Sequence, residues 1–146
     1  NLVLILTKIS LLTKSKGLLY FSENYDIYDE LEMCINEYDN NRFINEENKI
    51  QLIKGDANKT IPKYVESNKH LIVSLLYLDF DIYEPTVTAL NTLLPRIPKG
   101  GIIVFDEVNN NQWPGETIAL IEQLGLRHNR LECFEYEPNI SFIQLD

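Results

Sequence analysis

The amino-acid sequence predicts an α/β fold whose sheet is mostly parallel and ends in an antiparallel hairpin. From residue 50 onward, short apolar runs alternate with helical patterns, which is typical of β-α units. Near the end of the chain, two strand-like runs at residues 131–136 and 140–145 are separated by three residues. That loop is too short for a helical crossover, so these strands should be antiparallel neighbours. With 146 residues, 45% of them hydrophobic, we expect one folded domain spanning 1–146.

Three apolar runs in the middle of the chain are expected to form the parallel strands. They lie at residues 50–53, 71–78 and 102–105. The second run is apolar on both faces, which indicates a central strand with helices on both sides. A short helix is expected at 59–66, between the first two strands. A longer helix should open at Glu84–Pro85, between the second and third strands, because apolar residues recur there at helical spacing.

The remaining segments are less regular in pattern. A helix is expected to begin at Pro114 and stop at Gly125, and another over 25–38. Residues 1–10 suggest a helix that follows a missing turn. Open α/β sheets normally begin with a strand that leads into a glycine-rich cofactor turn, and the sequence before residue 50 has none. We therefore expect the N-terminal part of the fold to be incomplete.

Composition and charge narrow the range of partners. A formal net charge of -9 repels nucleic acid and anionic membranes, so a small molecule is the expected partner. The apolar run at residues 2–6 is too short for a membrane span and carries no signal-peptide cleavage pattern, which predicts a cytoplasmic location. Cys34 and Cys133 lack metal-binding spacing and are expected to be buried free thiols.

Acidic residues follow three of the expected strands. These are Asp56, Asp79 and the pair Asp106–Glu107. Because ligands bind beyond the carboxyl ends of parallel strands, the carboxylates should gather along one edge of the sheet. Like charges that close together destabilise a fold unless a cation or a bound ligand offsets them. Carboxylate oxygens are the ligands that magnesium, calcium and manganese prefer, so the pattern favours a metal site.

Helix capping is the alternative role for each of these carboxylates. A single aspartate at a strand end more often caps the following helix than binds a ligand. Asp79 and the pair Asp106–Glu107 are separated from their following helices by several residues, which favours metal ligation for this set. Asp81 is either a hydrogen-bond acceptor behind the metal ligands or the cap of the helix that begins near Glu84.

Five motifs together resemble the macrocin O-methyltransferase-like family of class I S-adenosylmethionine-dependent sugar O-methyltransferases. The resemblance covers about residues 49–125, and the order of strand ends is also similar to catechol O-methyltransferase. The motifs are Lys54-Gly55-Asp56-Ala57, Ile61-Pro62, Leu78-Asp79-Phe80-Asp81-Ile82-Tyr83-Glu84-Pro85-Thr86, Gly100-Gly101-Ile102-Ile103-Val104-Phe105-Asp106-Glu107 and Trp113-Pro114-Gly115-Glu116-Thr117. This resemblance implies a Rossmann-like class I methyltransferase sheet and metal-assisted methylation of a sugar hydroxyl on a glycan or a glycosylated natural product.

The resemblance also implies roles for particular residues. Magnesium would be held by Asp79, Asp106 and Glu107, and Asp79 is also the candidate general base if the metal does not fully engage it. S-adenosylmethionine would lie against the following residues: Asp56, Ala57, Asp79 and Phe80. From their position in the loops after two strands, rather than from the resemblance, Tyr83 and Trp113 are candidate contacts to the acceptor. Tyr83 is equally compatible with the core, whereas Trp113, in a polar loop just before a helix, is expected to be exposed.

Two questions stay open at this level. The family normally has a glycine-rich turn after the first strand and an acidic residue that binds the ribose, and the sequence shows neither. The alternative to an active enzyme is therefore a catalytically degenerate methyltransferase-like module that serves binding or assembly. The expected partner is a small-molecule or glycan acceptor, and homo-oligomerisation is left open.

Overall fold

The computed structural model describes residues 2–7, 27–43 and 50–146. The chain divides into two compact units, one formed by residues 1–12 and 55–146 and the other by residues 13–54. Within the described ranges, no helix is both long enough and apolar enough to cross a membrane.

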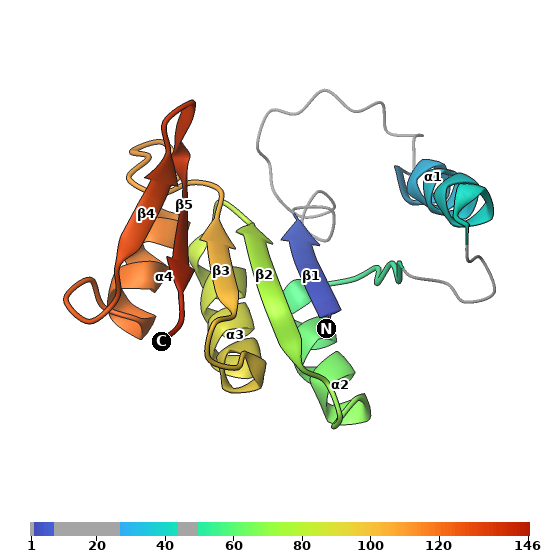
Figure 1. Ribbon diagram of the computed structural model, residues 1–146, viewed down its shortest axis with the longest axis horizontal. Coiled ribbons are helices and arrows are strands. Elements are labelled where there is room, and N and C mark those ends of the chain that lie inside the picture. The colour runs from blue at the N-terminus through green and yellow to red at the C-terminus, as the bar shows by residue number, and fades with distance from the viewer. Residues whose placement is uncertain (1, 8–26, 44–49) are drawn as a thin grey trace. The chain divides into compact units, whose positions relative to one another are not determined.

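The first unit is built on a five-stranded mixed sheet with the strand order β1-β2-β3-β5-β4 (Figure 1). The strands are β1 (Leu2–Thr7), β2 (Val73–Asp79), β3 (Ile102–Phe105), β4 (Leu131–Phe134) and β5 (Glu137–Gln144). The first three pair in parallel, whereas β5 runs antiparallel to both of its neighbours. The C-terminal antiparallel hairpin is therefore confirmed, but its turn lies at residues 135–136, and residues 137–139, which were expected to form the loop, belong to β5.

Three helices pack on one face of this sheet (Figure 1). They are α2 (Ala57–Ser67), α3 (Tyr83–Leu93) and α4 (Gly115–Gln123), and a single 3₁₀ turn, η2 (Leu94–Arg96), follows α3. Alternate residues of β2 are buried under this layer: Leu76 and Leu78 are fully buried, whereas Leu75 and Tyr77 are only half-buried.

The hydrophobic core lies between the sheet and these helices. Its fully buried side chains come from both layers: Leu76, Leu78, Phe105, Ala89, Leu90, Leu93, Leu120 and Ile143. Burying a leucine or phenylalanine completely contributes roughly 1.5 to 3 kcal/mol, so this layer supplies much of the stabilisation of the fold. It also fixes the strand ends from which the candidate site is built.

The second unit contains α1 (Ile27–Asn41) among its described residues. Arg42 forms an ion pair with Asp39 at 2.8 Å, and the Lys54 ammonium lies 5.1 Å from the centre of the Tyr28 ring. These contacts are consistent with the helix expected over 25–38, which is confirmed with its end extended to residue 41.

Several expected elements differ from the structure. Residues 50–53 form no strand, because an apolar run becomes a strand only where another backbone pairs with it, and none of the described strands does. The helix expected in residues 1–10 is wrong: residues 2–7 form β1, which pairs with β2. The thiols of Cys34 and Cys133 are free, as predicted, but exposed rather than buried.

The expectation of helices on both sides of the strand at 71–78 is wrong for the described residues, because α2, α3 and α4 all cover one face of the sheet (Figure 1). The other helices and strands expected after residue 55 are present, with ends that differ by a few residues. β3 has the predicted bounds, and α4 follows directly on Pro114. The helix expected at 59–66 begins two residues earlier, at Ala57, because Asp56 caps it. That cap belongs to the candidate site described next.

Candidate functional site

Two acidic strand ends lie next to each other at the carboxyl edge of the sheet. β2 and β3 are parallel with Leu78 opposite Phe105, and Asp79 is the last residue of β2. The backbone N–H of Asp106 donates to the Leu78 carbonyl oxygen at 3.0 Å, which continues the pairing one residue beyond β3. The ends of β2 and β3 are therefore neighbours, as the sequence predicted, and we call the three acidic residues that follow them, Asp79, Asp106 and Glu107, the acidic rim.

Two of the three carboxylates of the acidic rim accept hydrogen bonds from protein side chains. Asp106 accepts a hydrogen bond from the Tyr77 hydroxyl, and Glu107 Oε2 accepts from Asn110 Nδ2 at 2.5 Å. Burial, together with the hydrogen bond and the charge of Asp106, holds the pKa of Tyr77 above its usual range, so the phenol stays a donor. Among the described residues, no three His, Cys, Asp or Glu side chains are grouped closely enough to hold a metal ion.

The acidic rim suits a metal ion in its donor atoms but not in its present side-chain bonds. Three carboxylates are the donors that a hard cation prefers, and their strand-end placement suits magnesium. Their orientation does not, because Asp106 and Glu107 are engaged by Tyr77 and Asn110. Metal ligation by Asp79, Asp106 and Glu107 remains a prediction.

A buried glutamate on α4 connects the two loops of the acidic rim. Glu116 is fully buried, and its Oε1 accepts from the N–H groups of Phe80 at 2.8 Å and Asp81 at 3.1 Å. Its Oε2 accepts from the N–H of Glu107 at 3.2 Å. Burial raises the pKa of Glu116, the three N–H bonds act to lower it, and the charge of Asp106 raises it; the net pKa is about 7.

Sequence reasoning missed Glu116 and Tyr77. Glu116 stands in the first turn of α4, where an acidic residue usually compensates the helix dipole at the surface. Its burial follows from the neighbouring Gly115, on which a Cβ would lie 2.4 Å from the backbone nitrogen of Tyr83. This absence of a side chain lets α4 approach the start of α3. The only signal in the sequence is the adjacent pair Gly115–Glu116.

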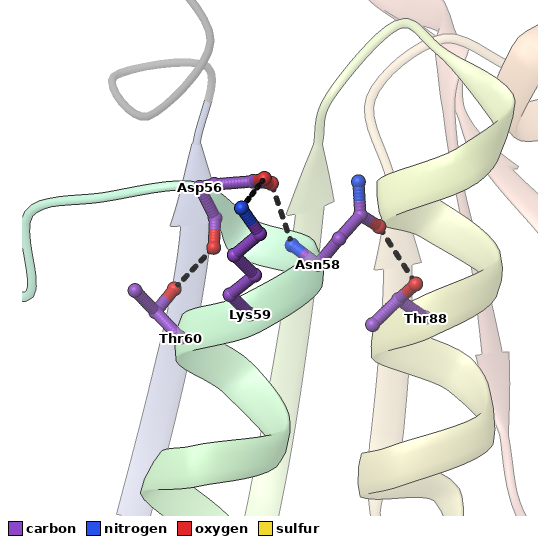
Figure 2. Close-up of polar contacts among 5 residues, drawn as sticks. All are labelled: Asp56, Asn58, Lys59, Thr60 and Thr88. Carbon is purple, nitrogen blue, oxygen red and sulfur yellow. Dashed lines mark hydrogen bonds and ion pairs between the residues drawn. The ribbon is translucent and has the colours of Figure 1, made fainter.

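The first turn of α2 lies at the same edge of the sheet (Figures 1 and 2). Asp56 caps this helix: its Oδ1 accepts from the Asn58 N–H at 3.1 Å, and its carbonyl accepts from the Thr60 hydroxyl at 3.1 Å. Lys59 Nζ lies 3.9 Å from Asp56 Oδ2. Asn58 in turn accepts from the Thr88 hydroxyl at 2.7 Å, which ties α2 to α3. The capping alternative therefore holds for Asp56, and its contact with a cofactor remains a prediction.

Two other predicted cofactor contacts have buried side chains. Ala57 is 4% exposed and Phe80 is 2% exposed, and both pack in the hydrophobic core. Any contact that they make to a cofactor would therefore come from their backbone. Asp81 is also buried, and it does not occupy the cap position of α3, which belongs to Ile82. Of the two roles considered for Asp81, capping is thus wrong.

The two predicted acceptor contacts are both exposed. Tyr83, the first residue of α3, is 37% exposed, and its hydroxyl donates to Glu122 Oε2 on α4 at 2.5 Å. Tyr83 is therefore not a core residue. Trp113 is 43% exposed in the loop before α4, as predicted. Their contact with an acceptor is not tested by these positions.

Comparison with known proteins gave consistent matches. The model of the Macrocin-O-methyltransferase (TylF) family matches residues 23–121, which is more than half of the chain. An apo structure of CalS11, described as a TDP-rhamnose 3'-O-methyltransferase of calicheamicin biosynthesis, is 31% identical with a TM-score of 0.78. The match covers 85% of this chain and 53% of CalS11, so the chain spans about half the length of that protein.

More distant matches add only the fold. The O-methyltransferase NovP is 17% identical with a TM-score of 0.60, and the match covers 80% of this chain and 44% of NovP. At that identity the likeness shows a shared α/β architecture. A comparison with functionally curated proteins gave no match.

Proposed function

Because this chain belongs to the macrocin O-methyltransferase family, we propose that it transfers the methyl group of S-adenosylmethionine to a hydroxyl group of a sugar. The observation that carries the proposal is the family match over residues 23–121, together with 31% identity to CalS11. CalS11 is described as acting on TDP-rhamnose, so a deoxysugar linked to a nucleotide is the first acceptor to try.

The residues proposed for the cofactor belong to two segments, the start of α2 and the end of β2 with the loop after it. They are Asp56, Ala57, Asp79 and Phe80. When bound, S-adenosylmethionine supplies an electrophilic methyl group on a sulfonium ion. The chain has to hold a sugar hydroxyl in line with that group and to accept the proton that the hydroxyl loses. We assign the proton to the Asp79 carboxylate, on the condition that the metal proposed below does not fully engage it, and we assign the sugar ring to the exposed faces of Tyr83 and Trp113.

Magnesium is part of the proposal, with Asp79, Asp106 and Glu107 as its ligands. Their carboxylate chemistry and shared edge support this choice. A bound cation would lower the pKa of the acceptor hydroxyl. Ligation requires Asp106 and Glu107 to exchange their bonds from Tyr77 and Asn110 for the cation. Calorimetric titration of the chain with Mg²⁺ tests this assignment, and heat unchanged by Asp79→Ala would contradict it.

A methyl-transfer assay tests the activity itself. The chain is incubated with S-adenosylmethionine labelled in its methyl group and with TDP-rhamnose, and label on the sugar is measured. We expect transfer by the wild-type chain and a loss of about 100-fold or more in Asp79→Asn, since general-base catalysis contributes on that order. Glu66→Gln, an exposed glutamate on α2, is the matched control. Binding of the cofactor without transfer to any sugar would favour the degenerate binding module.

A further inference from the structure

The two loops that carry the acidic rim share an unusual backbone feature. Asp81, in the loop after β2, and Asn109, in the loop after β3, both have φ of 60°. Among the described residues they are the only non-glycine positions with positive φ. Residues other than glycine adopt this conformation at a cost in free energy, and such positions persist where the surrounding structure holds them.

The first turn of α4 bonds to both of these residues. Glu116 Oε1 accepts from the Asp81 N–H at 3.1 Å, and Thr117 Oγ1 accepts from the Asn109 N–H at 2.9 Å. Consecutive side chains of one helix thus hold the two strained positions, one in each loop. We call Gly115, Glu116 and Thr117 the α4 brace, with Gly115 included because its missing side chain allows the close approach to α3.

The chemistry of Glu116 suits a link between two loops. An ionised carboxylate accepts with both oxygens, so it can take two N–H donors from one loop and a third from the other. A glutamine in its place offers one oxygen and a donor nitrogen, which leaves one of the two loops without an acceptor. Placing a charge in the interior is costly, and a carboxylate there needs all of these bonds.

We propose that the α4 brace fixes the spacing between Asp79 on one side and Asp106–Glu107 on the other, with Glu116 and Thr117 as positioning residues for the acidic rim. The proposal rests on the proposed function, in which these carboxylates bind Mg²⁺ and accept a proton. Neither Glu116 nor Thr117 contacts substrate in this proposal. They act through the backbone of the two loops, Glu116 at Phe80 and Glu107 and Thr117 at Asn109.

Hydrogen exchange of backbone amides, followed by NMR on the full chain, tests the brace directly. In Glu116→Gln we expect the single remaining side-chain oxygen to keep the two donors Phe80 and Asp81, because two hydrogen bonds hold it there. The amide of Glu107, in the other loop, then loses its acceptor, and its exchange should become at least tenfold faster. Thr117→Val, which keeps the side-chain shape, should speed exchange at Asn109 and leave Phe80 unchanged. Glu66→Gln should match the wild type. Wild-type exchange rates in both variants would overturn the brace.

Affinity for Mg²⁺ separates a positioning role from a merely structural one. Loss of a group that orients metal ligands typically weakens binding 10- to 100-fold, so we expect about a tenfold weaker Mg²⁺ affinity in Glu116→Gln. In methyl transfer, kcat should fall while KM for S-adenosylmethionine stays the same. Faster amide exchange with unchanged Mg²⁺ affinity and kcat would overturn the positioning role.

The two experiments also distinguish this inference from the proposed function. A wild-type chain that binds no Mg²⁺ and transfers no methyl group would overturn the proposed function. The exchange pattern at Phe80, Glu107 and Asn109 would in that case still decide whether the brace holds the two loops.

Discussion

The first turn of α2 and the acidic rim lie at the same edge of the sheet, and both are built on aspartates that follow a turn or a strand. They are held in different ways. The bonds of Asp56 reach residues two to four positions along the chain. The bonds of Glu116 reach residues 9, 35 and 36 positions away. The first site forms with its own helix, whereas the second exists only when α4 has packed against two loops.

The largest expected effect is that of Gly115→Ala, which disturbs the close contact of α4 with the start of α3 beside the acidic rim. The new Cβ would lie 2.4 to 2.5 Å from backbone atoms of Ile82 and Tyr83, which cannot rotate away. We expect the free energy of unfolding in urea to fall by about 4 kcal/mol. Gly125→Ala is the control, because it meets open space at φ +69° and should cost only about 1 kcal/mol of backbone strain. Equal losses would show that α4 does not depend on this close approach.

The next effect is a dependence of the unfolding free energy on pH, which arises from Glu116. It is measured with a chelator present, so that bound metal does not contribute. The pKa of the Glu116 carboxyl is 4.5 in the unfolded chain and about 7 in the folded protein. Between these pH values the unfolded chain releases the proton while the folded chain keeps it, so stability falls as pH rises. The difference in unfolding free energy between wild type and Glu116→Gln should fall by about 3 kcal/mol from pH 4.5 to pH 7. A difference that grows with pH would mean that the three N–H bonds outweigh burial.

Asp56→Ala should have a smaller effect, because it removes a local cap. We expect a loss of about 1 kcal/mol in thermal or urea unfolding, which is typical of an N-cap. Asp56→Asn keeps a capping oxygen and should retain most of that stability. If Asp56 also contacts the cofactor, the Asp56→Asn variant will bind S-adenosylmethionine more weakly although its fold is as stable. Unchanged binding in both variants would leave Asp56 as a cap only.

The smallest expected effect is that of Lys59→Gln at the same helix start. The Lys59 side chain is 80% exposed and its ammonium lies 3.9 Å from Asp56, so the pair is screened by solvent. We expect a change below about 0.5 kcal/mol in the unfolding free energy. A larger loss would mean that the start of α2 depends on charge pairing rather than on the cap.

The contrast between local and distant contacts also explains which features could be predicted from the sequence. The strand over 102–105, the hairpin and the carboxylates at the strand ends depend on local pattern and turn length, and these were predicted. Asp56 as a cap was among the alternatives for the same reason. Glu116 was not identified because its partners lie in two distant loops, and no spacing in the sequence links them.

Two errors have a similar physical origin. Residues 50–53 have the composition of a strand, but strand formation depends on a partner elsewhere in the chain. Residues 1–10 were expected to form a helix, but pairing with β2 makes residues 2–7 the strand β1. The apolar pattern of a segment is thus informative about burial, whereas pairing requires knowledge of the neighbours.

The position of β5 has a consequence for folding. β5 follows β4 in the chain yet lies between β3 and β4, so β3 remains an open edge until residues 137–144 have been synthesised. Unpaired apolar edges are where nascent chains aggregate, and distant pairings form slowly. The hairpin of β4 and β5 therefore covers the edge of β3 only after Asp106 and Glu107, beside β3, have been synthesised. During that interval, the charge of Asp106 and Glu107 next to the open edge would discourage another chain from pairing there.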